Sequence, residues 1–197
     1  MEFDLWCVYD SLIKFTESRS WKSLEKTMTI DEFREKSRMM NYVTIVGVDR
    51  DDVPTTIVLT NFNSSVPNHK KNFVSMVNAI GTKIILVSYR LLSSSIAEYA
   101  KISKINIETY TYNKFVTDMT KCPYVPKHEI MSSDEVAEML KFRYKKITDL
   151  PGIMQDDTQV IWIGAQVGDV IKITRFSEVT GLSVVHRVVK EGTVSVK

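Results

Sequence analysis

Hydrophobic and polar positions in the first part of the chain alternate between helical and strand-like spacing. Leu5, Tyr9 and Leu12 belong to an apolar series with a helical period, which predicts an amphipathic helix at the start of the chain. Residues 42–48 and 55–60 are rich in β-branched side chains and flank a polar turn, a pattern typical of two neighbouring strands.

Further helices and strands continue this alternation. Thr29 and Glu32 have the spacing of a capping box, which predicts a short helix before the first strand. Residues 73–80 form a helical stripe, residues 84–87 an apolar run typical of a strand buried on both faces, and residues 105–110 a further alternating strand. Strands interleaved with helices favour an α/β sheet for this part of the chain.

A domain boundary is predicted in segment 122–126, which holds two prolines that extend the chain and disfavour helix. The predicted domains are therefore residues 1–122 and residues 123–197. Beyond the boundary, Ser132 and Glu135 have the spacing of a second capping box, which predicts that a helix begins there.

The rest of the second domain is predicted to contain one helical turn and three strands. The turn is expected to begin at residues 150–151, with proline in a position where its missing N–H does no harm. Residues 158–163 are interpreted as a strand that ends at Gly164, and residues 170–175 and 182–189 as two more. The predicted fold class is α/β (α+β) in two domains.

Composition narrows the classes of function. The 197 residues carry 26 Lys and Arg against 24 Asp and Glu, so the net charge of +2 does not by itself indicate a nucleic-acid partner. Cys7 and Cys122 form no C-x-x-C motif, which argues against a structural zinc site or a disulfide framework. No apolar run approaches the ~20 residues of a membrane span. We expect a soluble, intracellular protein with no cofactor, no metal and no membrane partner.

An ordered series of residues in the second domain resembles a known family. Val125-Pro126-Lys127-His128 comes first, Ser132-Ser133-Asp134-Glu135 follows, and a run from Gly168 to Gly181 comes next. The series is similar to the C-terminal assembly domain of the fifth subunit of eukaryotic nuclear RNA polymerases, a domain that the archaeal counterpart shares. Strand-like residues of the first domain resemble the N-terminal jaw domain, which the archaeal counterpart lacks. The chain therefore resembles the eukaryotic or large-DNA-virus type.

The resemblance implies a non-catalytic subunit of a multisubunit DNA-directed RNA polymerase. Its C-terminal domain would dock on the largest subunit, beside the small common subunit, through Val125, Pro126, Lys127, His128, Gly168, Asp169, Arg175, Ser177, Glu178, Gly181 and Arg187. Its N-terminal domain would have a nuclease-like sheet and form part of the lower jaw near downstream duplex DNA. The expected location is a nucleus or, for a large DNA virus, a cytoplasmic viral factory or virion.

Candidates for a DNA contact are polar and basic residues of the first domain. Contact with phosphates is sequence-independent and needs only cationic side chains close to the duplex, and the serines stand where the family has a polar stretch near downstream DNA. The candidates are Lys70, Lys71, Arg90, Ser93, Ser94 and Ser95.

Two other functions stay open on the residues alone. A nuclease-like DNA-binding enzyme would use carboxylates to hold Mg²⁺ and a lysine two positions after an acid, but no acid here has lysine at that spacing. Asp49, Asp51 and Asp52 lie in a polar turn, where solvated turn chemistry is the simpler interpretation. His128 has no acid-base partner at a readable spacing, so packing or an interface is its simpler role. The second alternative is an interaction adaptor outside polymerase.

Overall fold

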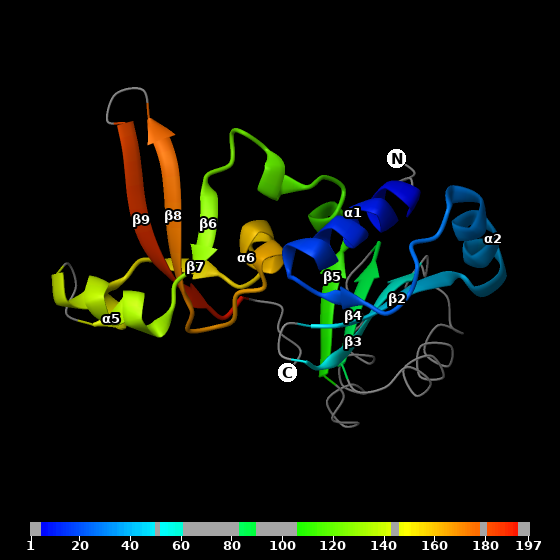
Figure 1. Ribbon diagram of the computed structural model, residues 1–197, viewed down its shortest axis with the longest axis horizontal. Helices are drawn as coiled ribbons and strands as arrows, with labels where there is room; N and C mark the ends of the chain where they lie inside the picture. The colour runs from blue at the N-terminus through cyan, green and yellow to red at the C-terminus, as the bar shows by residue number, and fades with distance from the viewer. Residues whose placement is uncertain are drawn as a thin grey trace. The chain divides into compact units, whose positions relative to one another are not determined.

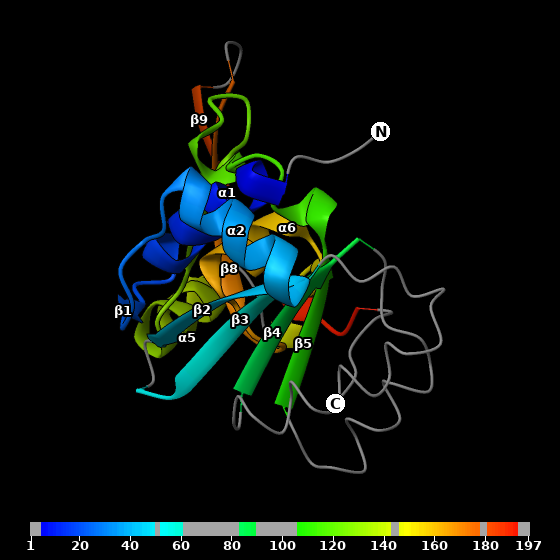
Figure 2. The same ribbon diagram turned by 90° about the vertical axis from the view of Figure 1, so that its right-hand side faces the viewer.

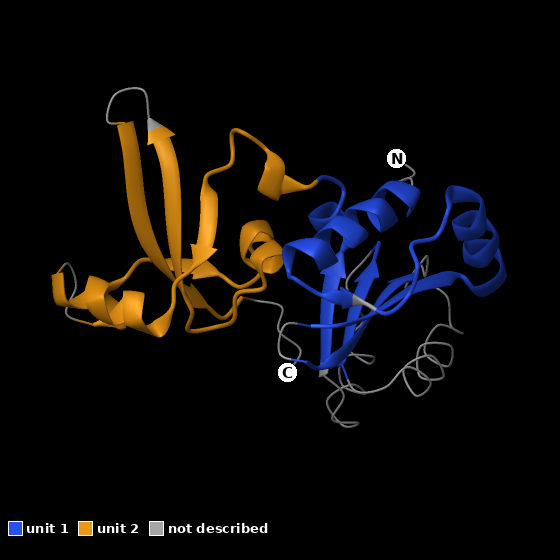
Figure 3. Cartoon of the chain, in the orientation of Figure 1, with its two compact units in different colours: residues 1–117, 195–197 blue, residues 118–194 orange. Residues whose placement is uncertain are grey.

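The computed structural model divides the chain into two compact units, and each has its own sheet (Figure 3). Unit 1 runs to Thr117 and unit 2 begins at Asp118. The predicted functional division at residues 122–123 stays a prediction. The structure describes residues 5–49, 52–60, 83–89, 106–142, 146–177 and 181–192.

Unit 1 is built on a five-stranded sheet with the order β1-β2-β3-β4-β5 (Figure 2). Pairing is antiparallel from β1 to β3 and parallel from β3 to β5. The predicted helix over 73–80 and the DNA-contact candidates Lys70, Lys71, Arg90 and Ser93–Ser95 lie outside the described residues. The strands are β1 (Lys22–Ser23), β2 (Tyr42–Val48), β3 (Pro54–Thr60), β4 (Lys83–Ser88) and β5 (Asn106–Thr111).

The burial patterns of these strands agree with the patterns of apolar residues in the sequence. The four residues from Ile84 to Val87 in β4 are each at most 1% exposed, so the predicted burial of this strand on both faces is confirmed. Strand β2 instead alternates buried and partly buried positions, as expected for a strand with one covered face. The predicted strands at 42–48, 55–60 and 105–110 are confirmed by β2, β3 and β5.

Two helices pack on the same side of this sheet (Figures 1 and 2). Helix α1 (Leu5–Ser18) buries the apolar series predicted from its spacing, and α2 (Ile30–Met40) begins at the predicted capping box. The Thr29 amide donates to Glu32 Oε2 at 2.7 Å and Thr29 Oγ1 accepts from the Glu32 amide. Phe33 packs against the rings of Trp6 and Tyr9, which joins the two helices. The short 3₁₀ helix η1 (Tyr112–Lys114) follows β5.

Unit 2 is built on a four-stranded sheet with the order β6-β8-β9-β7. Its capping box is present, because the Ser132 amide donates to Glu135 Oε2 at 2.8 Å and Ser132 Oγ accepts from the Glu135 amide. The strands are β6 (Lys127–Ile130), β7 (Gly152–Met154), β8 (Val170–Ser177) and β9 (Gly181–Lys190), and the helices are η2 (Met119–Lys121), α5 (Ser133–Phe142), η3 (Ile147–Asp149) and α6 (Thr158–Ile163).

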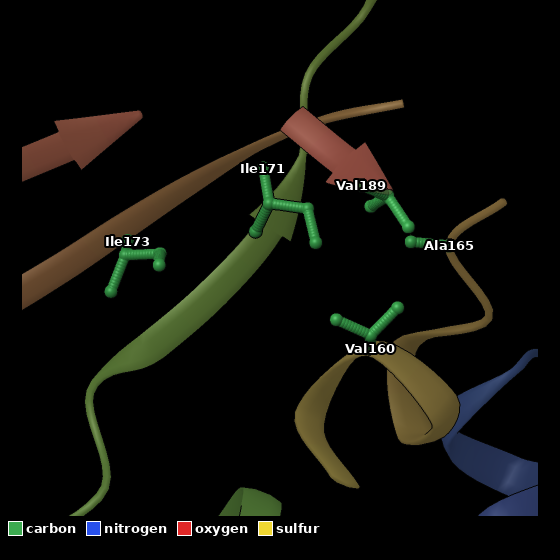
Figure 4. Close-up of a cluster of buried hydrophobic side chains, with 5 residues drawn as sticks. All are labelled: Val160, Ala165, Ile171, Ile173 and Val189. Atoms are coloured by element: carbon green, nitrogen blue, oxygen red, sulfur yellow. The ribbon is translucent and has the colours of Figure 1, made fainter. Parts of the chain in front are cut away.

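The part of this second sheet around Val170, Ile171 and Val188 lies between helices α5 and α6. On one face Ile171, Ile173 and Val189 pack with Val160 of α6 and with Ala165 (Figure 4). On the other face Val170 and Val188 pack with Leu150 and with Met139 of α5. Alternating strand residues therefore supply both small cores.

Two predictions for this unit are wrong. Residues 158–163 form helix α6 and not a strand, with Asp157 Oδ1 accepting from the Gln159 amide at its start and Gly164 in the left-handed region (φ 72°) at its end. The buried Trp162 therefore belongs to a helix. Residues 150–151 begin no helical turn, because η3 ends before them and strand β7 follows.

Membrane insertion through a helix finds no support in the described ranges. None of their helices has the length and apolar character needed to cross a bilayer.

Candidate protein–protein interface in unit 2

Strands β8 and β9 form a two-stranded ribbon that continues past helices α5 and α6 (Figure 1). Strand β6 pairs with β8 only from Ile171 to Thr174, and β7 pairs with β9 only from Val188 to Lys190. The outer part of the ribbon therefore has no described strand beside it. We call its described residues 175–177 and 181–184 the ribbon tip.

One face of the ribbon tip is apolar and exposed. Phe176 lies directly opposite Leu182, and their side chains are 76% and 74% exposed. Val184, two positions further along the same face of β9, is 37% exposed. Paired large apolar side chains on an antiparallel ribbon contact one another, so these three form one patch and not scattered exposed residues.

The opposite face of the ribbon carries the predicted arginines. Arg175 pairs with Ser183, and Arg187 lies four positions beyond Ser183 on the same face. Both arginines are exposed. Arg187 Nη1 also donates to the Gly152 carbonyl oxygen at 3.1 Å, which holds its guanidinium near the start of β7.

The predicted residues around β6 lie beside the same sheet. Lys127 Nζ pairs with Glu129 Oε1 at 2.6 Å on the strand surface. His128 pairs with Ile173, and its Nδ1 donates to the Pro126 carbonyl oxygen at 2.7 Å. The imidazole is thus held by the backbone of the preceding turn, an arrangement that orients a packing residue. The Val125 amide donates to the Cys122 carbonyl in the same segment.

Two glycines in the predicted set stand at opposite ends of the ribbon. Gly168 (φ 98°) and Asp169 form the turn before β8, where Asp169 Oδ2 accepts from the Gln166 amide at 2.8 Å. Gly181 (φ 69°) begins β9 next to Ser177. Eight strand residues separate the two ends, roughly 27 Å at about 3.4 Å per residue. The predicted interface residues therefore do not form a single cluster, and Glu178 lies outside the described part.

Sequence reasoning missed the apolar residues of the ribbon tip. Phe176, Leu182 and Val184 have ordinary strand alternation, and only the pairing of β8 with β9 brings them together. The available signal in the sequence was the large apolar residues, Phe176 and Leu182, on either side of the turn predicted to end at Gly181.

In unit 1, Asp49 differs from its predicted role as a solvated turn residue. Its side chain is only 6% exposed, and Oδ2 lies 2.7 Å from Lys83 Nζ. Oδ1 accepts from the Val53 amide at 3.0 Å. The group therefore stabilises the β2–β3 turn from inside. No cluster of three metal-ligating side chains occurs in the ranges that the structure describes.

The described groups of unit 1 with a strongly shifted pKa are the partly buried Tyr110 and the buried Tyr112. Burial raises the pKa of Tyr110, whose hydroxyl donates to Glu108 Oε2 at 3.0 Å. Burial also raises the pKa of Tyr112, whose hydroxyl donates to the Thr60 carbonyl. Arg19 approaches Glu108 from the end of α1, at 3.8 Å. These contacts join α1, β3 and β5 and form part of the packing.

Comparison with known proteins identifies the family. The model for the C-terminal domain of RNA polymerase Rpb5 matches residues 117–189. The DNA-directed RNA polymerase subunit Rpo5 of Methanocaldococcus jannaschii is 46% identical over 65 residues, which cover 33% of this chain and 83% of that protein. The chain belongs to the Rpb5 family of RNA polymerase subunits.

Other Rpb5-family relatives match different lengths of the chain. The subunit Rpo5 of Nitrosopumilus maritimus is 46% identical over 68 residues, or 34% of this chain and 82% of that protein. The DNA-directed RNA polymerase RPB5 homolog of African swine fever virus (isolate Warthog/Namibia/Wart80/1980) is 25% identical over 201 residues, covering 95% of this chain and 98% of that protein.

Family membership decides the general role. This Rpb5-family chain is a non-catalytic subunit of a multisubunit DNA-directed RNA polymerase. The resemblance predicted from the ordered residues of the second domain is confirmed, including its similarity to the archaeal counterpart. A free-standing nuclease and an adaptor outside polymerase are therefore set aside.

Proposed function

We propose that unit 2 attaches the chain to the largest subunit of its RNA polymerase, through the ribbon tip and the adjoining β6 segment. The observation that carries this proposal is the length of the archaeal relatives. More than four-fifths of the Methanocaldococcus jannaschii subunit aligns with only a third of this chain. A polymerase subunit can therefore consist of little more than this domain, so the domain contains what assembly requires.

The surface of unit 2 supports this role. Specific interfaces have an apolar centre with a polar rim, and arginine and aromatic residues are enriched among the side chains that dominate binding. Phe176 and Leu182 supply an apolar centre on one face of the ribbon tip, and Arg175 supplies a cation on its opposite face. The small common subunit would lie beside the same domain.

Unit 1 has the second proposed role, as part of the lower jaw near downstream duplex DNA. Its sheet and helices account for the additional length shared with the African swine fever virus relative, which matches 95% of the chain. The resemblance of its sheet to that of a nuclease is part of this proposal. Contact with DNA would be weak and sequence-independent. Lys70, Lys71, Arg90, Ser93, Ser94 and Ser95 stay the candidates. The chain works where its polymerase works, in a nucleus or in a viral factory.

Charge reversal at the ribbon tip tests the attachment. The substitution Arg175→Glu removes an exposed cation without disturbing the core, because Arg175 lies beyond the residues that pack on α6. We expect the affinity for the largest subunit to fall at least about tenfold, equivalent to roughly 1.4 kcal/mol. Co-purification after co-expression with the largest subunit measures this change.

The matched control is Lys141→Glu, which reverses an exposed charge on α5 in the same unit. It should assemble like the unmodified chain. Equal recovery of the Arg175→Glu variant would contradict the assignment of the interface to the ribbon tip.

A further inference from the structure

We propose that the open edge of β9 accepts an extended strand from the largest subunit. This strand would add to the unit 2 sheet at its edge, an arrangement called β-augmentation. The inference rests on the proposed function and specifies how that attachment is made. The predicted partner segment is an extended strand with apolar residues on one face and an acidic residue close to Arg187 on the other.

Two backbone hydrogen bonds near the end of β9 show which of its residues face β8 and which face the opposite edge. The Val189 amide donates to the Asp169 carbonyl on the β8 side at 2.9 Å, whereas the Val188 amide donates to the Pro151 carbonyl on the β7 side at 3.0 Å. Backbone groups of alternate residues in an antiparallel strand point to opposite edges. The N–H and C=O groups of Leu182 and Val184 therefore point to the side of β9 away from β8.

The edge of β9 that faces away from β8 has no described strand beside it at the ribbon tip. Strand β7 covers it only from Val188 onward. Over residues 182–186, no described strand pairs with β9 on this side. Unpaired donors and acceptors at a sheet edge are a template for another strand. Many edge strands are protected by proline or by inward-pointing charges, and residues 181–185 contain neither.

The two faces of β9 at this open edge carry different side chains, which an added strand would contact. On one face it would lie beside Leu182 and Val184, which are exposed and apolar. On the other face it would lie beside Ser183 and Val185, with Arg187 at the inner end of the open stretch. Since side chains alternate along a strand, the complementary segment has apolar residues toward the first face and an acidic residue near Arg187 on the second.

Charge favours a partner subunit over a second copy of this chain. The fully charged side chains in β8 and β9 are all basic: Lys172, Arg175, Arg187 and Lys190. Two copies of this chain would bring two basic ribbons together, and the repulsion between their like charges disfavours self-association. An acidic strand removes this repulsion and adds charge complementarity.

The substitution Val184→Pro tests the backbone contact. It keeps an apolar side chain but removes the amide that points to the open edge, and in this phase it removes no hydrogen bond to β8. The matched control, Val184→Thr, keeps the amide and the β-branched shape. We expect Val184→Pro to lower co-purification with the largest subunit at least tenfold and Val184→Thr to change it less than twofold. Equal binding by the proline variant would overturn the inference.

Hydrogen exchange gives an independent readout that does not depend on a variant. In the free chain the amides of Ser183 and Val185 should be protected by β8, and those of Leu182 and Val184 should exchange rapidly. In the complex with the largest subunit, the Leu182 and Val184 amides should slow at least tenfold. A complex in which they exchange as in the free chain would overturn β-augmentation while leaving the attachment itself intact.

Two further outcomes would also overturn the inference. If the unmodified chain does not bind the largest subunit, the proposed function fails and the inference fails with it. If the Leu182 and Val184 amides become protected in the isolated chain as its concentration rises, with a doubling of mass, a second copy occupies the edge.

Discussion

Asp49 holds the turn between β2 and β3 through contacts on both sides of its carboxylate. Oδ1 accepts from the Val53 amide, and Oδ2 pairs with Lys83 at the start of β4. The side chain is nearly inaccessible, whereas Lys83 retains 19% exposure. Breaking a partly buried pair of this kind costs folding free energy. The remaining ion is still shielded from water but no longer has a partner of opposite charge.

The substitution Asp49→Ala should therefore lower the free energy of unfolding of unit 1 by about 2–3 kcal/mol. Native-state hydrogen exchange of the β4 amides measures this change within unit 1. The matched control is Asp10→Ala, which breaks the exposed Asp10–Lys14 pair on α1 and should change stability by about 0.5 kcal/mol or less. Similar small effects for both variants would show that the buried pair does not stabilise the turn.

At the scale of elements, the start of α5 depends on a titratable group. The hydrogen bond from the Ser132 amide, followed by that from its side chain, lowers the pKa of Glu135 below its ordinary value of 4.5. A carboxyl whose pKa falls on folding stabilises the folded state above the unfolded pKa. This stabilisation is lost as the pH falls through the folded pKa.

The substitution Glu135→Gln should make the stability of unit 2 less dependent on pH below about 4.5. Glutamine can still accept from the Ser132 amide through its side-chain oxygen, but it does not titrate. Urea unfolding midpoints between pH 3 and pH 7 measure the effect. Glu138→Gln, an exposed change on the same helix, is the control. If both variants follow the pH dependence of the unmodified chain, the capping carboxylate is not responsible for it.

Helix α6 shows where local patterns are insufficient at this scale. Six consecutive residues that are largely apolar fit a buried strand and a buried helix equally well. The deciding features are Asp157 at the start, Gly164 at the end, and burial of Val160, Ile161 and Trp162 around successive sides of the turn. Strand β4 raised no such ambiguity, since β-branched residues dominate it.

At the scale of the whole molecule, each unit has its own sheet and its own buried side chains. Loss of a surface contact in one unit should therefore leave the fold of the other intact. This separation agrees with the comparisons, in which archaeal relatives match a third of the chain and a viral relative matches nearly all of it.

Neutralising Lys70, Lys71 and Arg90 to glutamine should thus reduce crosslinking to downstream DNA severalfold while assembly with polymerase is unchanged. Each removed cation also removes a phosphate contact, so the remaining crosslinking should depend less on salt. Photo-crosslinking in the purified polymerase measures this, with Arg175→Glu as the variant that should lose assembly and crosslinking together. Crosslinking that equals the unmodified level would exclude these three residues from the DNA contact.

The amino-acid sequence by itself determined the features that depend on near neighbours. Both capping boxes were predictable because their partners lie three residues apart, and strand β4 was predictable because its apolar run is continuous. The ordered residues from Val125 onward were also sufficient to identify the family. Each of these signals is complete within one short segment or in the order of several.

Only the tertiary structure decided which residues share a surface. Asp49 and Lys83 are separated by 34 positions, and strand pairing brings them into contact. Phe176 and Leu182 form one exposed patch because the register of β8 and β9 places them opposite each other. A shift of one residue in that register would exchange the apolar and basic faces of β9 relative to β8. Burial and pairing register depend on segments that are distant in sequence, so no local pattern could reveal the open edge of β9.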